Sequence, residues 1–222
     1  MRLQLLLIVP QPSPLVKTAE MIQALIFDCD GTLIDSMFAH YSAWREALSS
    51  QGIPLDEQSF YKHSGTPSSR VIPMLAEAQG KQVDFHRALE AKERHFIGSI
   101  DLLRRIPHVV EIADRHRGKI KMAVASGGTR NLVHQQLRQV QIMDWFETIV
   151  TCEDTEHHKP DPDVFLEAAR RLNVAPKHCR VYEDGEPGIE AARRAGMECI
   201  DIRKMQTAGE SNTTPDMPQQ DG

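Results

Sequence analysis

The sequence predicts an α/β fold, a doubly wound (Rossmann-like) parallel sheet core with a helical cap subdomain inserted after the first strand. Three observations predict it. The apolar run 24–27 has the length of a buried parallel strand. Beyond residue 105, strand and helix patterns alternate, as in βαβ units. Between these regions lie about seventy residues with helical patterns only, which is too long for a plain crossover connection.

Helical spacing marks the inserted segment. Apolar residues recur at helical intervals over 36–51, and Gly52 is expected to end that helix. Further helical patterns cover 70–79 and 84–96. We expect this insert to lie over the carboxyl end of the sheet as a lid.

The remaining core pattern repeats strand and helix in turn. The expected strands are 120–125, 148–151, 179–182 and 197–202, and the expected helices are 109–116, 129–140, 162–172 and 187–195. Asp161 before Pro162 is typical of an N-cap followed by proline at the first helical position. Gly196 after Ala195 is typical of the residue that follows a helix end.

The predicted domain organisation follows from these patterns. The core comprises residues 21–35 and 105–205, and the cap comprises residues 36–104. Residues 1–20 form a leader that we expect to lie outside the fold, since its short apolar stretch cannot span a bilayer and no signal-peptide cleavage pattern follows it. Residues 206–222 are polar and are expected to be a disordered tail.

Composition narrows the function classes. The chain has 222 residues and a formal net charge of −5, which gives no electrostatic footprint for nucleic acid. Its four cysteines lack a C-x-x-C spacing and are typical of reduced thiols, so we expect a cytoplasmic protein. We further expect a monomer with no membrane partner.

Two acids follow the first expected strand. Asp28 and Asp30 stand directly after 24–27. In open α/β sheets, ligands bind at the carboxyl ends of strands. A buried strand that ends in acids is costly unless a cation neutralises them. The alternative is an ordinary solvated turn.

Three further segments at strand ends weigh against that alternative. Ser126 and Gly127 offer a hydroxyl and a backbone N–H at a helix N-terminus, which suits a phosphate. Lys159 precedes another helix and can hold a phosphoryl oxygen. Glu183 and Asp184 supply the oxygen ligands that Mg²⁺ prefers. Taken alone, each segment has a plainer interpretation as a turn or a solvated loop.

Taken in chain order, these segments resemble the four motifs of the haloacid dehalogenase-like superfamily of phosphohydrolases. The chain is similar to its β-phosphoglucomutase-like branch, and there to small sugar-phosphate phosphatases of the fructose-1-phosphate or 6-phosphogluconate type. The resemblance covers residues 21–203. It rests on Asp28-x-Asp30-Gly31-Thr32, His40-x-x-x-Trp44, His158-Lys159-Pro160-x-Pro162-Asp163 and Glu183-Asp184-x-x-x-Gly188-Ile189-x-Ala191-Ala192.

The resemblance implies a phosphomonoesterase with a covalent intermediate. Asp28 would attack phosphorus and form an aspartyl-phosphate. Asp30 would be the general acid and base, which calls for a raised pKa. Ser126, the Gly127 N–H and Lys159 would bind the phosphoryl oxygens.

The resemblance also implies a metal and a substrate. Mg²⁺ would be held by the Asp28 carboxylate, the Asp30 backbone carbonyl and Asp184, with Glu183 near or in the coordination shell. The substrate would be a small phosphorylated sugar or sugar acid. The residues expected to contact its phosphate or its sugar are Gly31, Thr32, His40, Gly65, Thr66 and Arg70.

Two other functions stay open. A β-phosphoglucomutase-like mutase would return the phosphoryl group to a sugar; family members of that kind have valine after the motif glycine, whereas Thr32 stands here. A non-catalytic binding or regulatory protein would tolerate the loss of a motif acid, and this sequence lacks none of them.

Overall fold

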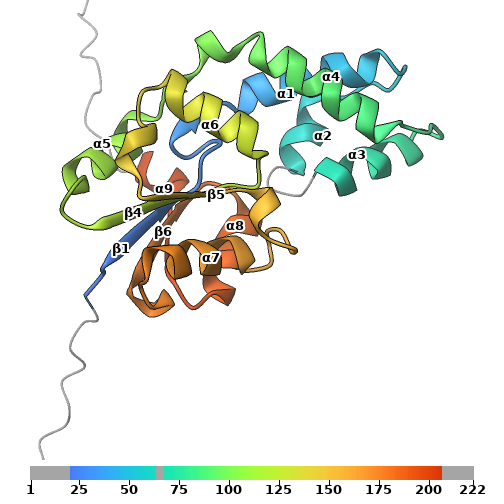
Figure 1. The fold of residues 1–222 in the computed structure, drawn as a ribbon. Coiled ribbons are helices and arrows are strands. Elements are labelled where there is room, and N and C mark those ends of the chain that lie inside the picture. Colours follow the sequence, from blue (N-terminus) through green and yellow to red (C-terminus); the bar gives the residue numbers. More distant parts are fainter. Residues whose placement is uncertain (1–20, 64–67, 207–222) are drawn as a thin grey trace, which may run out of the picture.

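The computed structural model describes residues 21–63 and 68–206 (Figure 1). Within them a five-stranded sheet has the order β5-β4-β1-β6-β7, and every neighbouring pair is parallel. The predicted α/β fold is confirmed. The strands are β1 (Ala24–Phe27), β4 (Lys121–Ala125), β5 (Thr148–Val150), β6 (Cys179–Glu183) and β7 (Glu198–Asp201).

The central strand β1 is buried on both faces. Leu25 and Phe27 pack toward α5 and α6, whereas Ala24 and Ile26 pack toward α7 and α8. Figure 1 shows the first helix pair above the sheet and the second below it. This two-sided burial explains why the strand is an unbroken apolar run. The helices are α5 (Pro107–His116), α6 (Arg130–Gln139), α7 (Asp163–Leu172) and α8 (Glu186–Arg194).

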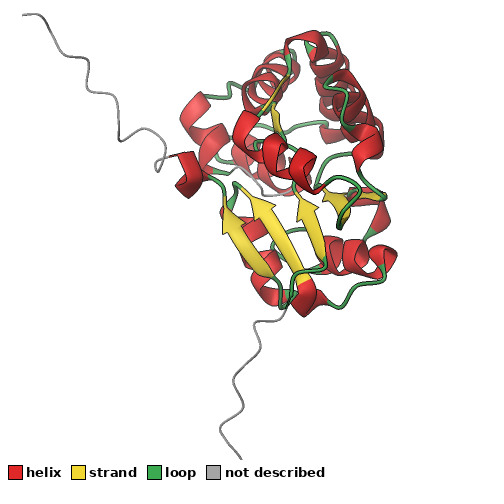
Figure 2. Cartoon of the chain, turned by 90° about the vertical axis from the view of Figure 1, so that its left-hand side faces the viewer, coloured by secondary structure: helices red, strands yellow, loops and turns green. Residues whose placement is uncertain are grey.

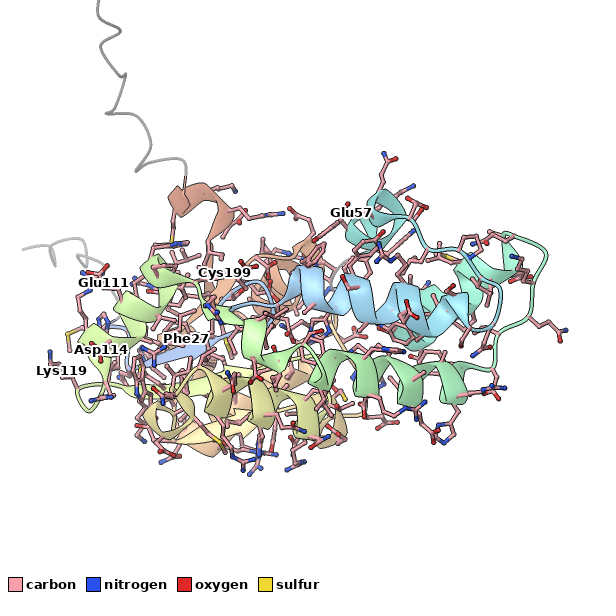
Figure 3. The ribbon with its side chains drawn as sticks, turned by 90° about the horizontal axis from the view of Figure 1, so that it is seen from above. Phe27, Glu57, Glu111, Asp114, Lys119 and Cys199 are labelled. Atoms are coloured by element: carbon pink, nitrogen blue, oxygen red, sulfur yellow. The ribbon has the colours of Figure 1, made fainter. Side chains whose placement is uncertain are left out.

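The inserted helices form a layer with its own core. It contains Tyr41, Trp44 and Leu48 from one face of the first helix, packed with Ile72 and Ala88. Figure 3 shows α1 and α4 side by side at the right of the view, with Glu57 near them. Asp114 and Lys119 lie at the opposite end of the molecule, at the left. The helices are α1 (Met37–Ser49), α2 (Glu57–Lys62), α3 (Ser68–Glu77) and α4 (Phe85–Ile97). We call residues 36–104 the cap.

A short ribbon joins the cap to the core. β2 (Ile34–Asp35) and β3 (Arg104–Arg105) pair antiparallel, so the chain leaves and re-enters the core at one place. Figure 2 shows the arrowheads of the sheet pointing toward helices drawn above it, and Asp28, Ser126 and Glu183 at these strand ends line one cavity with residues of the inserted helices. The cap therefore lies beyond the carboxyl ends of the strands, where the sequence places the acids.

Some local details differ from the expectation. Pro162 itself is the N-cap of α7, and the Asp161 carboxylate instead accepts a hydrogen bond from Arg194, so the predicted Asp161 cap is wrong. The predicted helix end at Gly196 is confirmed by its positive φ of 71°. The short helices are η1 (Ile100–Leu102), η2 (Met143–Trp145), η3 (Cys152–Asp154), η4 (Pro176–His178) and α9 (Arg203–Gln206).

The two expected terminal segments lie almost entirely outside the part of the chain that the structure describes. Residues 1–20, the expected leader, and 207–222, nearly all of the expected tail, lie outside the described residues. Among the helices that are described, none combines the length and the apolar character needed to cross a membrane.

Candidate active site

A buried lysine joins two of the strand-end acids. The Lys159 Nζ lies 2.6 Å from Asp28 Oδ1 and 2.8 Å from Glu183 Oε1. Asp28 follows β1 and Glu183 ends the neighbouring β6, so parallel pairing brings both carboxylates to one edge. None of the three is more than 6% exposed. The lysine thus compensates charges that would otherwise be costly to bury.

Two glycines make room for these acids. A Cβ at Gly188, in the first turn of α8, would overlap the Glu183 carboxylate. Gly31 has a positive φ of 82°, and a Cβ there would overlap the Asp184 carboxylate. Thr32 supports the same carboxylate, since its Oγ1 donates to Asp184 Oδ1 at 3.1 Å. Gly31 and Thr32 therefore contact a strand-end acid.

Three carboxylates converge beside the lysine. One oxygen each of Asp28, Glu183 and Asp184 lies within 4.8 Å of the others. Burial and the Glu183 charge raise the pKa of Asp184 to about 7, and burial raises the pKa of Asp28 above its usual range although Lys159 opposes this. The three carboxylates therefore carry more negative charge, when ionised, than the single Lys159 ammonium can neutralise. An all-oxygen donor set with excess negative charge fits a hard divalent cation.

Asp30 has a different environment from Asp28. Its Oδ1 accepts hydrogen bonds from Ser36 Oγ and His40 Nε2, both at 2.7 Å. Burial alone would raise the pKa of Asp30, but His40 and Ser36 outweigh burial and lower it. This is the opposite of the raised pKa that an acid needs. The physical reason is that His40, on the first cap helix, donates to the core carboxylate.

The pKa of His40 is also shifted in this arrangement. Burial and the nearby Lys92 charge lower the pKa of His40, although Asp30 opposes the shift. Because a carboxylate only accepts hydrogen bonds, His40 donates to it through Nε2–H. The structure thus places His40, expected to be a substrate contact, against Asp30.

The turn after β4 carries the predicted phosphate-binding groups. Ser126 is 1% exposed, and its Oγ accepts a hydrogen bond from the Gly128 N–H at 3.0 Å. A Cβ at Gly128 would lie 3.2 Å from that hydroxyl and 3.6 Å from Asp30 Oδ2. A Cβ at Gly127 would meet open space. The turn therefore lies beside Asp30 with its backbone accessible.

A cavity of about 340 Å³ connects the core and the cap. Its core side includes Asp28, Asp30, Ser126, Gly127, Lys159 and Asp184, and its cap side includes Trp44, Phe60, Ile72, Phe85, Lys92 and Glu93. The structure thus brings the four separated motifs together. Arg70 is exposed and does not line this cavity, so its contact with substrate stays a prediction. Gly65 and Thr66 lie outside the described residues.

Four residues at the site were not predicted. Ser36 is the N-cap of α1, but its hydroxyl makes no cap bond and turns to Asp30. Lys92 and Glu93 lie between Leu89 and Phe96 on α4, at a spacing that could have placed them on the cavity face. Gln136 on α6 is fully buried at the cavity, and the sequence around it carries no signal for this.

Comparison with known proteins agrees with the geometry. The chain is 34% identical over 186 residues to the fructose-1-phosphate phosphatase YqaB of Escherichia coli, covering 83% of this chain and 98% of that protein. It is 33% identical to a phosphorylated carbohydrates phosphatase of Thermotoga maritima, covering 81% of this chain and 84% of the other.

A solved structure is also similar. The β-phosphoglucomutase of Clostridium difficile superposes with a TM-score of 0.74 at 26% identity, covering 84% of this chain and 88% of that one. A family model described as haloacid dehalogenase-like hydrolase matches residues 25–202, which span all four motifs. The chain therefore belongs to the haloacid dehalogenase-like hydrolase family, as the order of its strand-end motifs predicts.

Proposed function

We propose that this hydrolase is a Mg²⁺-dependent phosphatase of small sugar phosphates that works through an aspartyl-phosphate on Asp28. The observation that carries the proposal is the buried contact of Lys159 with Asp28 and Glu183 at the floor of the cavity. In an ordinary solvated turn, water would stabilise the two acids, and no buried lysine would be needed to compensate their charge. The names of two relatives, both sugar phosphatases, support the same substrate class.

Asp28 is the proposed nucleophile. Lys159 fixes Oδ1, so the carboxylate has a defined direction toward the cavity. A bond forms between an Asp28 oxygen and phosphorus while the ester P–O bond breaks. Lys159, Ser126 and the Gly127 N–H are placed to hold the oxygens of the transferring phosphoryl group, where transition-state charge resides.

Asp30 is the proposed proton carrier. Ser36 and His40 hold Oδ1, and Oδ2 lies near Gly128 at the phosphate turn. The negative charge of an arriving phosphate raises the pKa of a neighbouring carboxyl. Asp30 would then protonate the leaving alkoxide and later take a proton from the water that attacks phosphorus. The P–O bond to Asp28 breaks in that second step and phosphate leaves.

Mg²⁺ is the proposed metal. The Asp28, Glu183 and Asp184 carboxylates, with the Asp30 carbonyl, would hold it. When bound, the ion screens the repulsion between an anionic nucleophile and an anionic phosphate. Gly31 and Thr32 would act here by shaping and orienting Asp184.

The test is phosphate release from a panel of sugar monophosphates with Mg²⁺ and no bisphosphate activator. We expect phosphate release by the natural protein and a loss of activity of at least about a thousandfold for Asp28→Asn. Asp114→Asn, at the far end of the molecule (Figure 3), is the matched control and should keep full activity.

Other outcomes favour the other functions. Turnover that requires a sugar bisphosphate would favour a mutase, in line with the β-phosphoglucomutase that this fold resembles. Inactivity across the whole panel would favour a binding or regulatory protein. Full activity of Asp28→Asn would remove the nucleophile from the proposal.

A further inference from the structure

A carboxylate from the cap reaches the phosphate end of the cavity. Glu93 on α4 accepts a hydrogen bond at Oε1 from Thr129 Oγ1, at 3.0 Å. Thr129 is the N-cap of α6 and directly follows the turn that contains Ser126 and Gly127. Glu93 is half-buried and lines the cavity. This bond therefore connects cap and core beside the place where the ester of a bound phosphate would lie.

The second oxygen of Glu93 is available to a ligand. Within residues 21–63 and 68–206, Thr129 is the hydrogen-bond partner found for Glu93, and it uses Oε1. Oε2 has no such partner there. A carboxylate oxygen in a cavity is a strong acceptor for hydroxyl groups, and a strong source of repulsion for another anion.

The neighbouring Lys92 also lines the cavity. Lys92 is 6% exposed, and its ammonium lies 5.9 Å from the Trp44 ring centre and 5.1 Å from that of Phe96. Burial lowers the pKa of Lys92 to about 8, and Asp30 and Glu93 are the charges that oppose the fall. Its charge thus lies near two carboxylates of this chain, Asp30 and Glu93.

The rest of the cap side suits a sugar skeleton. Trp44, Phe60, Ile72 and Phe85 line the cavity with apolar and aromatic surface. Such surface packs against the C–H groups of a sugar or polyol, while the hydroxyl groups need a separate acceptor. Glu93 is placed to be that acceptor.

We propose that Glu93 binds hydroxyl groups of the substrate's leaving group and repels a second acidic group, so that the substrates are neutral sugar or polyol monophosphates. Phosphorylated sugar acids and sugar bisphosphates are excluded by the same carboxylate. This inference rests on the proposed phosphatase function and narrows its substrate class. It also bears on the mutase alternative, because a mutase must accept a bisphosphate in this cavity.

The experiment compares kcat/KM on glucose 6-phosphate, 6-phosphogluconate and acetyl phosphate. The first two differ at C1, which is a ring hemiacetal in glucose 6-phosphate and a carboxylate on an open chain in 6-phosphogluconate, and the third has no hydroxyl groups. The natural protein should prefer glucose 6-phosphate over 6-phosphogluconate by about tenfold or more. Glu93→Gln should reduce that preference about tenfold, and should lower the ratio of glucose 6-phosphate to acetyl phosphate by a similar factor, mainly through KM.

Two further variants separate this role from a structural one. Glu90→Gln makes the same change at an exposed position on the same helix and should leave both ratios unchanged. Thr129→Val removes the bond between cap and core but keeps the carboxylate, so it should lower all three kcat/KM values together. A Thr129→Val protein with the altered ratios of Glu93→Gln would show that Glu93 only holds the cap, and would overturn the inference.

These measurements distinguish a failure of the Glu93 inference from a failure of the phosphatase proposal. Hydrolysis of acetyl phosphate with equal effects of Glu93→Gln on all three substrates would overturn the Glu93 inference and leave the phosphatase proposal standing. A natural protein that prefers 6-phosphogluconate would do the same. A natural protein that hydrolyses none of these three phosphates, nor any of the wider sugar-phosphate panel, would overturn both.

Discussion

The Lys159 ammonium lies 2.6 Å from the Asp28 carboxylate, although 131 residues separate them in the chain. The same ammonium lies 2.8 Å from Glu183. Burial would lower the pKa of Lys159, but Asp28 and Glu183 raise it above its usual range. The lysine is therefore charged, and it holds together the ends of two neighbouring strands on which the proposed chemistry depends.

Removing that ammonium should destabilise the fold. Lys159→Met leaves two buried carboxylates unpaired, so we expect the free energy of unfolding without divalent metal to fall by about 3–5 kcal/mol. Urea unfolding measures this. The exposed Lys119→Met is the matched control and should change little. Equal stability of the two variants would contradict a charge-compensating role for Lys159.

Asp184 should make the metal-free protein less stable as pH rises. Its pKa is raised to about 7, by burial and by Glu183, while an unfolded aspartate titrates near 3.9. Between these values the unfolded chain has lost the proton and the folded one keeps it, so the free energy of unfolding falls with rising pH by on the order of 2–4 kcal/mol, and levels off above about pH 7.

Chelator-treated protein and its Asp184→Asn variant, unfolded in urea between about pH 4 and pH 8, test this. Other groups titrate in both proteins, so the difference between them isolates Asp184. The free energy of unfolding should fall with rising pH in the natural protein, and it should fall less in Asp184→Asn. A difference that stays constant across this range would contradict the raised pKa.

Magnesium should reverse the effect, because its carboxylate ligands must be ionised to bind it. We expect Mg²⁺ to raise the melting temperature more at about pH 8 than at about pH 5.5, with a stabilisation of about 2.7 kcal/mol at a hundred times Kd. Differential scanning calorimetry measures it, and Asp28→Asn should weaken the response. No stabilisation at either pH, together with phosphate release in excess chelator, would remove the metal from the proposal.

Gln136 should help to keep Asp30 ionised. It is fully buried at the cavity, and its side chain is one of the groups that lower the pKa of Asp30. Gln136→Met removes that polar group, so we expect the pKa of Asp30 to rise and the acidic side of the pH profile of kcat/KM to move to higher pH. Gln139→Met, exposed at the end of the same helix, should leave the profile unchanged. An unchanged profile in Gln136→Met would show that this amide does not act on Asp30.

The parts of the fold that could be predicted have strong local signals. The strand 24–27 is buried on both faces and so reads as an unbroken apolar run, and the acids follow it directly. β2 and β3 have two residues each and exist only because they pair across the cap insertion, so no local pattern marks them. Helix α2 was missed because its six residues bury none of their side chains fully.

The same distinction applies to the site. Asp28, Ser126, Lys159 and Asp184 could be predicted because each follows a strand or opens a helix. The lowered pKa of Asp30 could not, because it depends on His40 reaching back from the cap. Likewise, the Glu93–Thr129 bond joins residues 36 positions apart on two different layers, and only the packed structure brings them together.

The proposed covalent intermediate on Asp28 can be trapped and located in the chain. The protein is mixed with a sugar monophosphate radiolabelled at phosphorus, quenched in acid during turnover, and digested for peptide analysis. We predict label on the peptide that contains Asp28, and none in Asp28→Asn. Label on a different peptide, or full turnover by Asp28→Asn, would contradict it.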